Sequence, residues 1–130
     1  MCIVNDYFKK FYPEDANSAW TMRQCVESYG REYEGKDSAA RIFPEMVCAD
    51  GFEMSVQGHF GAYSSPRGDF EPHYLSVEVS TAPRAEPLFE SHGGHTYDGF
   101  SIYGYVPVEL VAKVIERHGG LASSVTQDQR

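Results

Sequence analysis

The 130-residue chain lacks the apolar length that a membrane span or a secretory signal requires. Its apolar runs are only a few residues long, whereas a helix that crosses a bilayer needs about 20 such residues. The opening stretch "MCIVNDYFKK" has no basic start followed by an apolar segment, so it does not resemble a secretory signal. We therefore expect no membrane insertion and a cytoplasmic location, in the cell that hosts the protein.

Cysteine is also scarce, with Cys2, Cys25 and Cys48 spread along the first half of the chain. No two of them form a CxxC pair, and an odd number does not make a disulfide framework. A zinc site built on these thiols would need a fourth ligand from a distant part of the chain. We therefore expect reduced thiols, no structural metal and no cofactor.

Basic residues are fewer than acidic ones. The chain has 11 lysines and arginines and 19 aspartates and glutamates, so its formal net charge is −8. Nucleic acid and anionic lipid would repel a surface of this charge. We expect no direct nucleic-acid binding, and an acidic surface that could instead meet a basic surface on a partner protein. The alternative is that the negative charge only keeps a small protein soluble.

The sequence motifs of common enzymes are missing as well. There is no glycine-rich phosphate loop followed by Lys-Ser/Thr, no GxSxG nucleophile elbow and no HExxH zinc motif. His118 falls at the end of a predicted helix, where a histidine interacts favourably with the helix dipole. We therefore assign no catalytic residue and expect a protein that is not an enzyme.

What the chain does have is enough apolar material for a core, with 42% hydrophobic and 14% aromatic residues. Helical spacing predicts a first helix over residues 3–12, capped by Asn5 or Asp6 and stopped by Pro13. A second helix begins near Asn17 or Ser18. Its predicted core-facing stripe is Met22, Cys25, Val26, Tyr29 and Tyr33.

From residue 42 onward the apolar residues alternate with a period of two, which indicates β-strands. Alternation on both sides of Asp50-Gly51 predicts a hairpin with a tight primed turn, in which both residues adopt positive φ. Further strands are predicted at 74–80 and 100–106, separated by a long loop over 82–99. A helix then starts at Pro107 and ends before Gly119-Gly120.

This order of elements predicts an α+β fold. We expect a small antiparallel sheet of three to four strands packed with a C-terminal helix and preceded by two N-terminal helices. Residues 1–120 would form one domain, with a helical segment at 1–40 and the sheet and C-terminal helix at 41–120. Residues 121–130 would form a flexible tail.

The stretch "ESHGGHTYDGF" contains the most suggestive polar cluster of the sequence. His92, His95 and Asp98 are candidate metal ligands, with Glu90 as a further carboxylate. Zinc ligands at HxxxH spacing share one helical face, but here the spacing is HxxH and Gly93-Gly94 disfavours a helix. An adaptable, solvent-exposed loop is the leading interpretation. A small metal-binding enzyme or metal sensor is the alternative.

Tyrosine is abundant, with nine residues, several of them near this predicted loop and the last strand: Tyr97, Tyr103 and Tyr105, together with Phe100. Tyrosine gives a large contact area at low conformational cost and is enriched in binding surfaces. Packing at the sheet edges is the alternative role. The residues that we expect to contact a partner are Glu14, Asp15, Glu32, Glu34, Asp37, Tyr97 and Asp98.

Within residues 43–120, three groups of motifs occur in a fixed order. The first is Asp50, Gly51, Phe52, Met54, Ser55, Val56 and Gln57. The second is Tyr63, Ser65, Pro66 and Arg67, which is followed by a VEV strand. The third is Tyr103, Gly104, Tyr105, Val106, Pro107 and Glu109, which leads to a final HGG. This series resembles small accessory proteins encoded by phages and prophages.

The resemblance implies no particular reaction. The chain departs from the pattern by roughly forty additional N-terminal residues, which are candidates for a specific function. Small acidic phage proteins often inhibit host defence, and anti-CRISPR proteins are examples. By this analogy the chain is expected to be an inhibitor that occupies a basic nucleic-acid-binding surface on a host protein or ribonucleoprotein complex. A phage structural or accessory protein is another reading, and the oligomeric state stays open, with a dimer among the alternatives.

Overall fold

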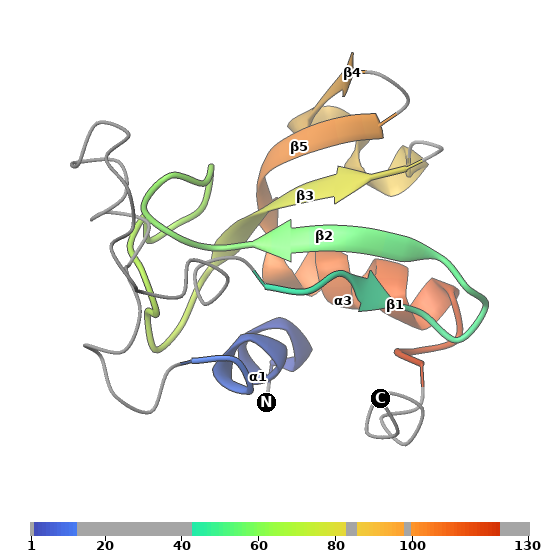
Figure 1. Cartoon of the computed structure of the whole chain (residues 1–130). Coiled ribbons are helices and arrows are strands. Elements are labelled where there is room, and N and C mark those ends of the chain that lie inside the picture. The colour runs from blue at the N-terminus through green and yellow to red at the C-terminus, as the bar shows by residue number, and fades with distance from the viewer. Residues whose placement is uncertain (1, 13–42, 83–85, 98–99, 123–130) are drawn as a thin grey trace, which may run out of the picture.

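The structure is a computed structural model that describes residues 2–12, 43–82, 86–97 and 100–122, with the backbone alone for 94–97 and 100. Eight elements follow one another along this part of the chain (Figure 1). They are α1 (Ile3–Lys9), β1 (Met46–Val47), β2 (Glu53–Gln57), β3 (Ser76–Thr81), the 3₁₀-helix η2 (Pro87–His92), β4 (Gly93–Tyr97), β5 (Phe100–Pro107) and α3 (Val108–Arg117). The expected α+β class is confirmed.

The strands form one antiparallel sheet of five strands in the order β1-β2-β3-β5-β4. The sequence predicted three to four strands and assigned 82–99 to a loop, which is wrong for much of that range. Pro87–His92 forms η2, and Gly93–Tyr97 forms an edge strand that pairs with β5. The two glycines were taken to disfavour a helix and to fit a loop, but β5 supplies the backbone partners that hold them in a strand.

The predicted hairpin at Asp50-Gly51 is present, with Met46 opposite Met54. The turn is not the primed type, because Gly51 (φ 94°) is its only described residue with a positive φ. The Gly51 amide donates to the Cys48 carbonyl at 2.9 Å, and the Cys48 amide donates to the Phe52 carbonyl at 2.8 Å. This is a three-residue loop that ends on a left-handed glycine.

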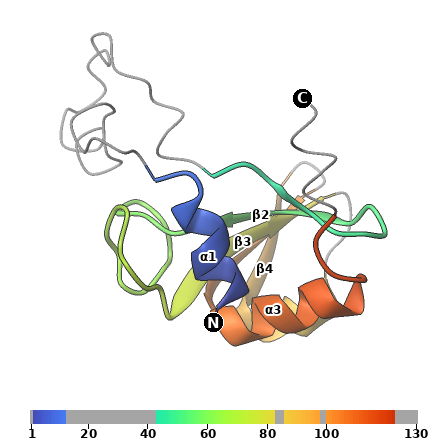
Figure 2. The same ribbon diagram turned by 90° about the horizontal axis from the view of Figure 1, so that it is seen from below.

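Both described α-helices lie on the same side of the sheet (Figure 2). They cover the face toward which the buried side chains of the strands point, and α1 contacts α3 directly. We call the opposite side of the sheet its open face. The common core includes Val4, Phe8, Met46, Met54, Val56, Val77, Val79, Tyr103, Val106, Val111, Val114 and Ile115. The N-terminal helix is therefore part of the same core as the sheet.

The helix α1 does not begin as the sequence suggested. Asn5 was expected to cap it, but the cap position belongs to Cys2, which makes no side-chain capping bond. Asn5 instead lies inside the molecule, 3% exposed. Its Oδ1 accepts from the Tyr74 amide at 2.7 Å, and its Nδ2 donates to the Tyr74 carbonyl at 3.1 Å. The side chain thus ties α1 to the segment that precedes β3.

Gln57 makes a similar backbone-like pairing at the end of β2. It accepts from the Phe43 amide at 2.9 Å and donates to the Phe43 carbonyl at 2.8 Å. Pro44 follows and cannot donate to a neighbouring strand, and β1 begins only at Met46, at the edge of the sheet. The Gln57 side-chain amide therefore supplies the hydrogen bonds to Phe43 at the point where backbone pairing between the two strands ends.

The C-terminal helix matches its prediction, with Pro107 at its start and Gly119 and Gly120 at positive φ after its end. The next two residues had been assigned to the flexible tail, but they lie beside β1. Leu121 pairs with Cys48, and the Ala122 amide donates to the Val47 carbonyl at 2.7 Å. The second predicted helix and residues 123–130 lie outside the described residues. No helix in the described part of the chain has the length and apolar composition of a membrane span.

Candidate functional site

The segment 58–75 connects β2 to β3 and is organised around one buried tyrosine, Tyr74. The Tyr74 hydroxyl lies within hydrogen-bond distance of the carbonyls of Gly58 and Gly68, which share its single proton, and it accepts from the Glu71 amide. The side chain is fully buried, and this burial raises its pKa. The loop is therefore held to the core at several points, which makes it a defined support for the side chains it carries.

Gly58 is required for this arrangement, because a Cβ there would lie 2.8 Å from the Tyr74 ring. We expect Gly58→Ala to lower the free energy of unfolding by about 1–3 kcal/mol, the usual cost of overpacking a core. Ser80→Ala, at a half-buried position of β3, is the control and should change stability by less than about 0.5 kcal/mol. Chemical denaturation measures both. Equal stability of Gly58→Ala and the wild type would contradict this role of Gly58.

The loop brings Tyr63 beside Tyr105 of β5. The Tyr105 amide donates to the Tyr63 carbonyl at 2.9 Å, and the two ring centroids are 5.8 Å apart. Both side chains remain exposed, at 50% for Tyr63 and 49% for Tyr105. Two residues about forty positions apart in the sequence thus form one exposed aromatic pair.

Three features fix the position of this pair on the open face. The Tyr63 amide donates to the Glu78 carboxylate at 2.9 Å. A Cβ on Gly104 would lie only 3.1 Å from the Tyr63 Cβ, so the absence of a side chain at 104 permits the close approach. Tyr105 has φ 51°, a left-handed conformation that non-glycine residues seldom adopt. Such strain is concentrated at functional sites.

Arg67 completes the cluster. Its guanidinium lies over the Tyr63 ring, 5.4 Å from the ring centroid, and its Nε donates to the Phe60 carbonyl at 3.0 Å. Tyrosine and arginine are the residue types that most often dominate binding energy in protein interfaces. We call Tyr63, Arg67 and Tyr105 together the Tyr63–Tyr105 surface.

Sequence reasoning identified only part of this surface. Tyr105 was among the tyrosines expected to be available for contact, but Tyr103 is buried, with its ring packed 5.3 Å from that of Phe89. Tyr63 and Arg67 were quoted only as part of a motif. The signal that could have found them is the short spacing of Tyr, Pro and Arg in a turn-rich segment, but nothing in it reveals that Gly104 lies beneath Tyr63.

Most of the residues predicted to contact a partner cannot be placed. Six of them lie outside the described residues: Glu14, Asp15, Glu32, Glu34, Asp37 and Asp98. For Tyr97, the backbone lies at the end of β4 and pairs with Phe100. The prediction of their role therefore stays a prediction.

The candidate metal ligands His92 and His95 do not share a loop. His92 is the last residue of η2, and His95 lies in β4 opposite Ile102. Asp98 lies outside the described residues. Within the described ranges, no group of three or more His, Cys, Asp or Glu side chains could hold a metal ion. Of the other three histidines, His59 accepts from the Gly61 amide, His73 is exposed, and His118 lies at the end of α3.

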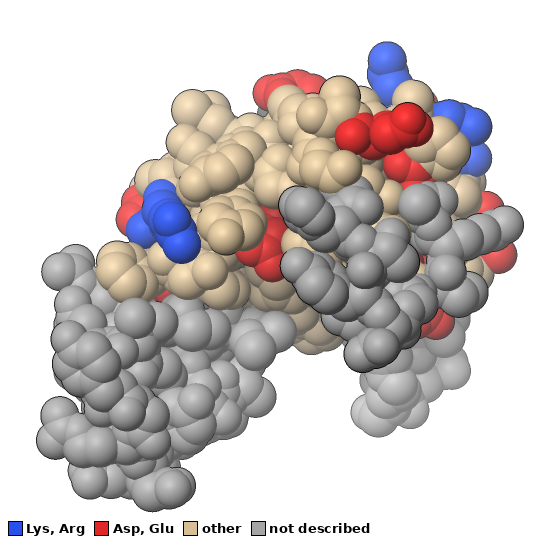
Figure 3. All heavy atoms as spheres, turned by 90° about the horizontal axis from the view of Figure 1, so that it is seen from above, with Lys and Arg blue, Asp and Glu red and all other residues tan. Residues whose placement is uncertain are grey.

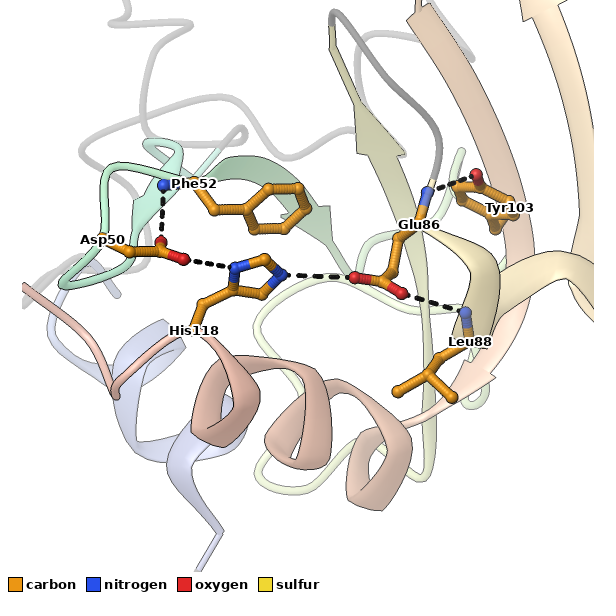
Figure 4. A network of polar contacts seen from close by, with 6 residues as sticks. All are labelled: Asp50, Phe52, Glu86, Leu88, Tyr103 and His118. Carbon is orange, nitrogen blue, oxygen red and sulfur yellow. Dashed lines mark hydrogen bonds and ion pairs between the residues drawn. The ribbon is translucent and has the colours of Figure 1, made fainter.

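A different histidine forms a polar network that joins three segments of the chain (Figure 4). His118 follows α3, and its Nδ1 lies 2.7 Å from an Asp50 carboxylate oxygen. Its Nε2 lies 3.3 Å from a Glu86 oxygen. The imidazole stacks on the Phe52 ring, with centroids 4.1 Å apart and planes 8° from parallel. The network joins the β1–β2 turn, the end of α3 and the residue before η2.

Both carboxylates in this network also accept backbone amides. Asp50 accepts from Phe52 at 3.0 Å, and this bond, followed by the one with His118, holds the pKa of Asp50 below its usual range. Glu86 accepts from Leu88 at 3.0 Å. The hydrogen bond to Asp50 is the main reason that the pKa of His118 is raised, and Glu86 adds to it, although partial burial acts in the opposite direction.

This geometry argues against a catalytic role for His118. A general base needs a free ring nitrogen within reach of a substrate, and both nitrogens of His118 already contact carboxylates. The nearby Cys48 is buried, which raises the pKa of its thiol to about 11 and disfavours the reactive thiolate. The network is therefore structural in this conformation.

Comparison of the chain with protein-family models, with curated proteins and with solved structures found no match.

Proposed function

We propose that the protein is a non-enzymatic, acidic binding protein that contacts its partner through the Tyr63–Tyr105 surface. The observation that carries the proposal is the exposed aromatic pair itself. Tyr105 is kept in a strained backbone conformation and Tyr63 is kept close to Gly104, yet neither ring is used in the core. An arrangement that costs stability and leaves two aromatic rings exposed is typical of a surface that is buried in a complex.

The net charge of −8 supports a basic surface on the partner. In the view of Figure 3, acidic side chains are distributed over the described part of the molecule, and the basic ones form no continuous area there. Opposite charges on two partners accelerate association and make it sensitive to salt. Together with the resemblance to phage accessory proteins, this favours a phage-encoded inhibitor of a host defence complex, of the anti-CRISPR type, that occupies a basic nucleic-acid-binding surface.

The predicted acidic contacts begin next to the same loop. Tyr12, shortly after α1, donates its hydroxyl to the Glu71 carbonyl, and its ring lies 5.4 Å from that of Phe70. Glu14 and Asp15 follow Tyr12 by two and three positions in the sequence and lie outside the described residues. That Tyr12 is bound to the loop carrying Tyr63 supports testing these first predicted acids together with the Tyr63–Tyr105 surface.

Affinity capture from the bacterial host at two salt concentrations tests the proposed function. We expect one basic protein or ribonucleoprotein to be retained at about 0.1 M salt and largely released at about 1 M, because the screening length falls from about 10 Å to about 3 Å. Glu14→Gln with Asp15→Asn should weaken capture. Glu109→Gln with Glu116→Gln, which removes two exposed acids from α3, is the charge-matched control.

The other readings of the sequence predict different outcomes of this capture. A phage structural or accessory protein would appear as a persistent homodimer without a host partner. A partner retained equally at both salt concentrations, or weakened equally by both pairs of substitutions, would contradict a contact based on the N-terminal acids.

A further inference from the structure

Glu86 occupies an unusual position for a carboxylate. It is only 5% exposed, and among the described residues His118 is the one basic group in contact with it. A buried carboxylate without a positive partner is strongly destabilising. The environment of Glu86 therefore depends on the charge of His118.

The protonation state of His118 decides how many of its contacts are favourable. A protonated imidazole donates from both nitrogens, so it satisfies Asp50 and Glu86 together. A neutral imidazole has one N–H group and must present a lone pair to one of the two carboxylates. The Asp50 contact is the shorter, at 2.7 Å against 3.3 Å, so the neutral ring keeps its proton on Nδ1 and turns its lone pair toward Glu86.

Loss of the His118 proton mainly affects the start of η2. Glu86 cannot regain water while it stays buried, so the repulsion is relieved only when this segment moves outward. Phe89 remains anchored in the core beside Tyr103, which limits the movement to a local opening. Asp50, by contrast, is half exposed and its hydration can change without displacement of the β1–β2 turn.

We propose that His118 is a pH-responsive latch: in its doubly protonated form it holds the β1–β2 turn and the start of η2 to the end of α3, and on losing a proton it releases the start of η2, from Glu86 to Leu88. The latch is a regulatory property of the fold. It stands independently of the proposed partner, because it rests only on contacts within the described residues.

The direction of the pH dependence follows from the groups that face His118. These are Asp50 from the β1–β2 turn and Glu86 from the start of η2, while Glu116 and Arg117 on its own helix are exposed. The pKa of His118 is raised in the folded state, so its contribution is complete below about pH 6.5 and is lost as the pH rises through the folded pKa. The pKa of Asp50 is lowered, so its contribution is lost only in acid.

Hydrogen exchange resolved by residue tests the latch. The Leu88 amide donates to Glu86 and the Phe52 amide donates to Asp50, so each reports on one side of His118. Between about pH 5.5 and about pH 8.5, we expect the protection factor of Leu88, corrected for intrinsic exchange, to fall on the order of tenfold. Protection of Phe52 should change less. A parallel NMR titration should show the His118 ring losing its proton above the ordinary range for histidine.

Two variants test whether the pH dependence of Leu88 protection comes from the His118–Glu86 contact or from a change in overall stability. Glu86→Gln keeps an oxygen for the Leu88 amide and supplies an NH₂ group that a neutral His118 can accept from, so the fall in Leu88 protection should disappear. His73→Gln, at an exposed histidine outside the network, should leave the fall unchanged.

Three results would overturn the proposal. In the first, the Leu88 protection factor of the wild type does not change with pH. In the second, it falls with pH in Glu86→Gln as much as in the wild type. In the third, the His118 ring loses its proton at or below the ordinary pH for histidine. The first and third can be read on the unmodified protein, so the test does not depend on the variants folding.

Discussion

Replacement of Asn5 by alanine is expected to lower the free energy of unfolding by about 3 kcal/mol. The substitution leaves the buried amide and carbonyl of Tyr74 without partners, and each unsatisfied buried group costs about 1–3 kcal/mol. It also detaches α1 from the segment that precedes β3. Urea denaturation followed by circular dichroism measures the change, which should shift the midpoint without a large change in slope.

Asp6→Ala is the matched control, because Asp6 is exposed on the same helix one position further on. It should change stability by less than about 0.5 kcal/mol. Equal effects of the two substitutions would contradict the view that α1 is attached to the core through Asn5.

Removal of both rings of the Tyr63–Tyr105 surface is expected to weaken partner binding by about a hundredfold or more. Central interface tyrosines typically contribute about 2 kcal/mol each, and a tenfold change in affinity corresponds to about 1.4 kcal/mol. We would combine Tyr63→Ala with Tyr105→Asn, because asparagine adopts positive φ more readily than most residues. Binding should fall while the thermal stability of the protein stays the same or rises.

Leu75→Ala provides the control for this prediction. Leu75 is 60% exposed and lies at the same end of the sheet, where its carbonyl accepts from the Val108 amide, but it is not part of the aromatic pair. It should leave binding within a factor of a few. A double tyrosine variant that binds like the wild type would rule out the Tyr63–Tyr105 surface as the contact.

The elements that local patterns determine were predicted well. The C-terminal helix has an apolar face, a proline at its start and two glycines after its end, and the structure shows it where it was expected. The hairpin at Asp50-Gly51 and the strand around Val77 and Val79 follow from alternation in the same way. In each case the information lies within a few neighbouring residues.

Features that depend on distant partners were missed. The strand β4 contains Gly93 and Gly94 and has low intrinsic strand propensity, so only its pairing with β5 makes it a strand. Asn5 was read as a helix cap because its partner, Tyr74, is 69 positions away. The network around His118 joins three segments, and no local pattern brings Asp50 and Glu86 to its two nitrogens.

Prediction of the candidate site from the sequence was limited in the same way. The motifs that contain Tyr63 and Tyr105 are visible in the sequence, but their meeting on the open face depends on the path of the loop around Tyr74. The alternative of a metal-binding loop depended on sequence proximity alone. His92 and His95 are close in the sequence, but they belong to two different elements.

Site-specific photocrosslinking in the bacterial host is the measurement that tests the proposed binding function most directly. A photoreactive phenylalanine analogue would replace Tyr63 in one variant and Glu116, exposed on α3, in another. We predict that position 63 crosslinks to one basic host protein, that irradiation of a host lysate at high salt does not form this crosslink, and that position 116 gives none. No crosslink from position 63, or the same products from both positions, would contradict a binding protein that acts through the Tyr63–Tyr105 surface.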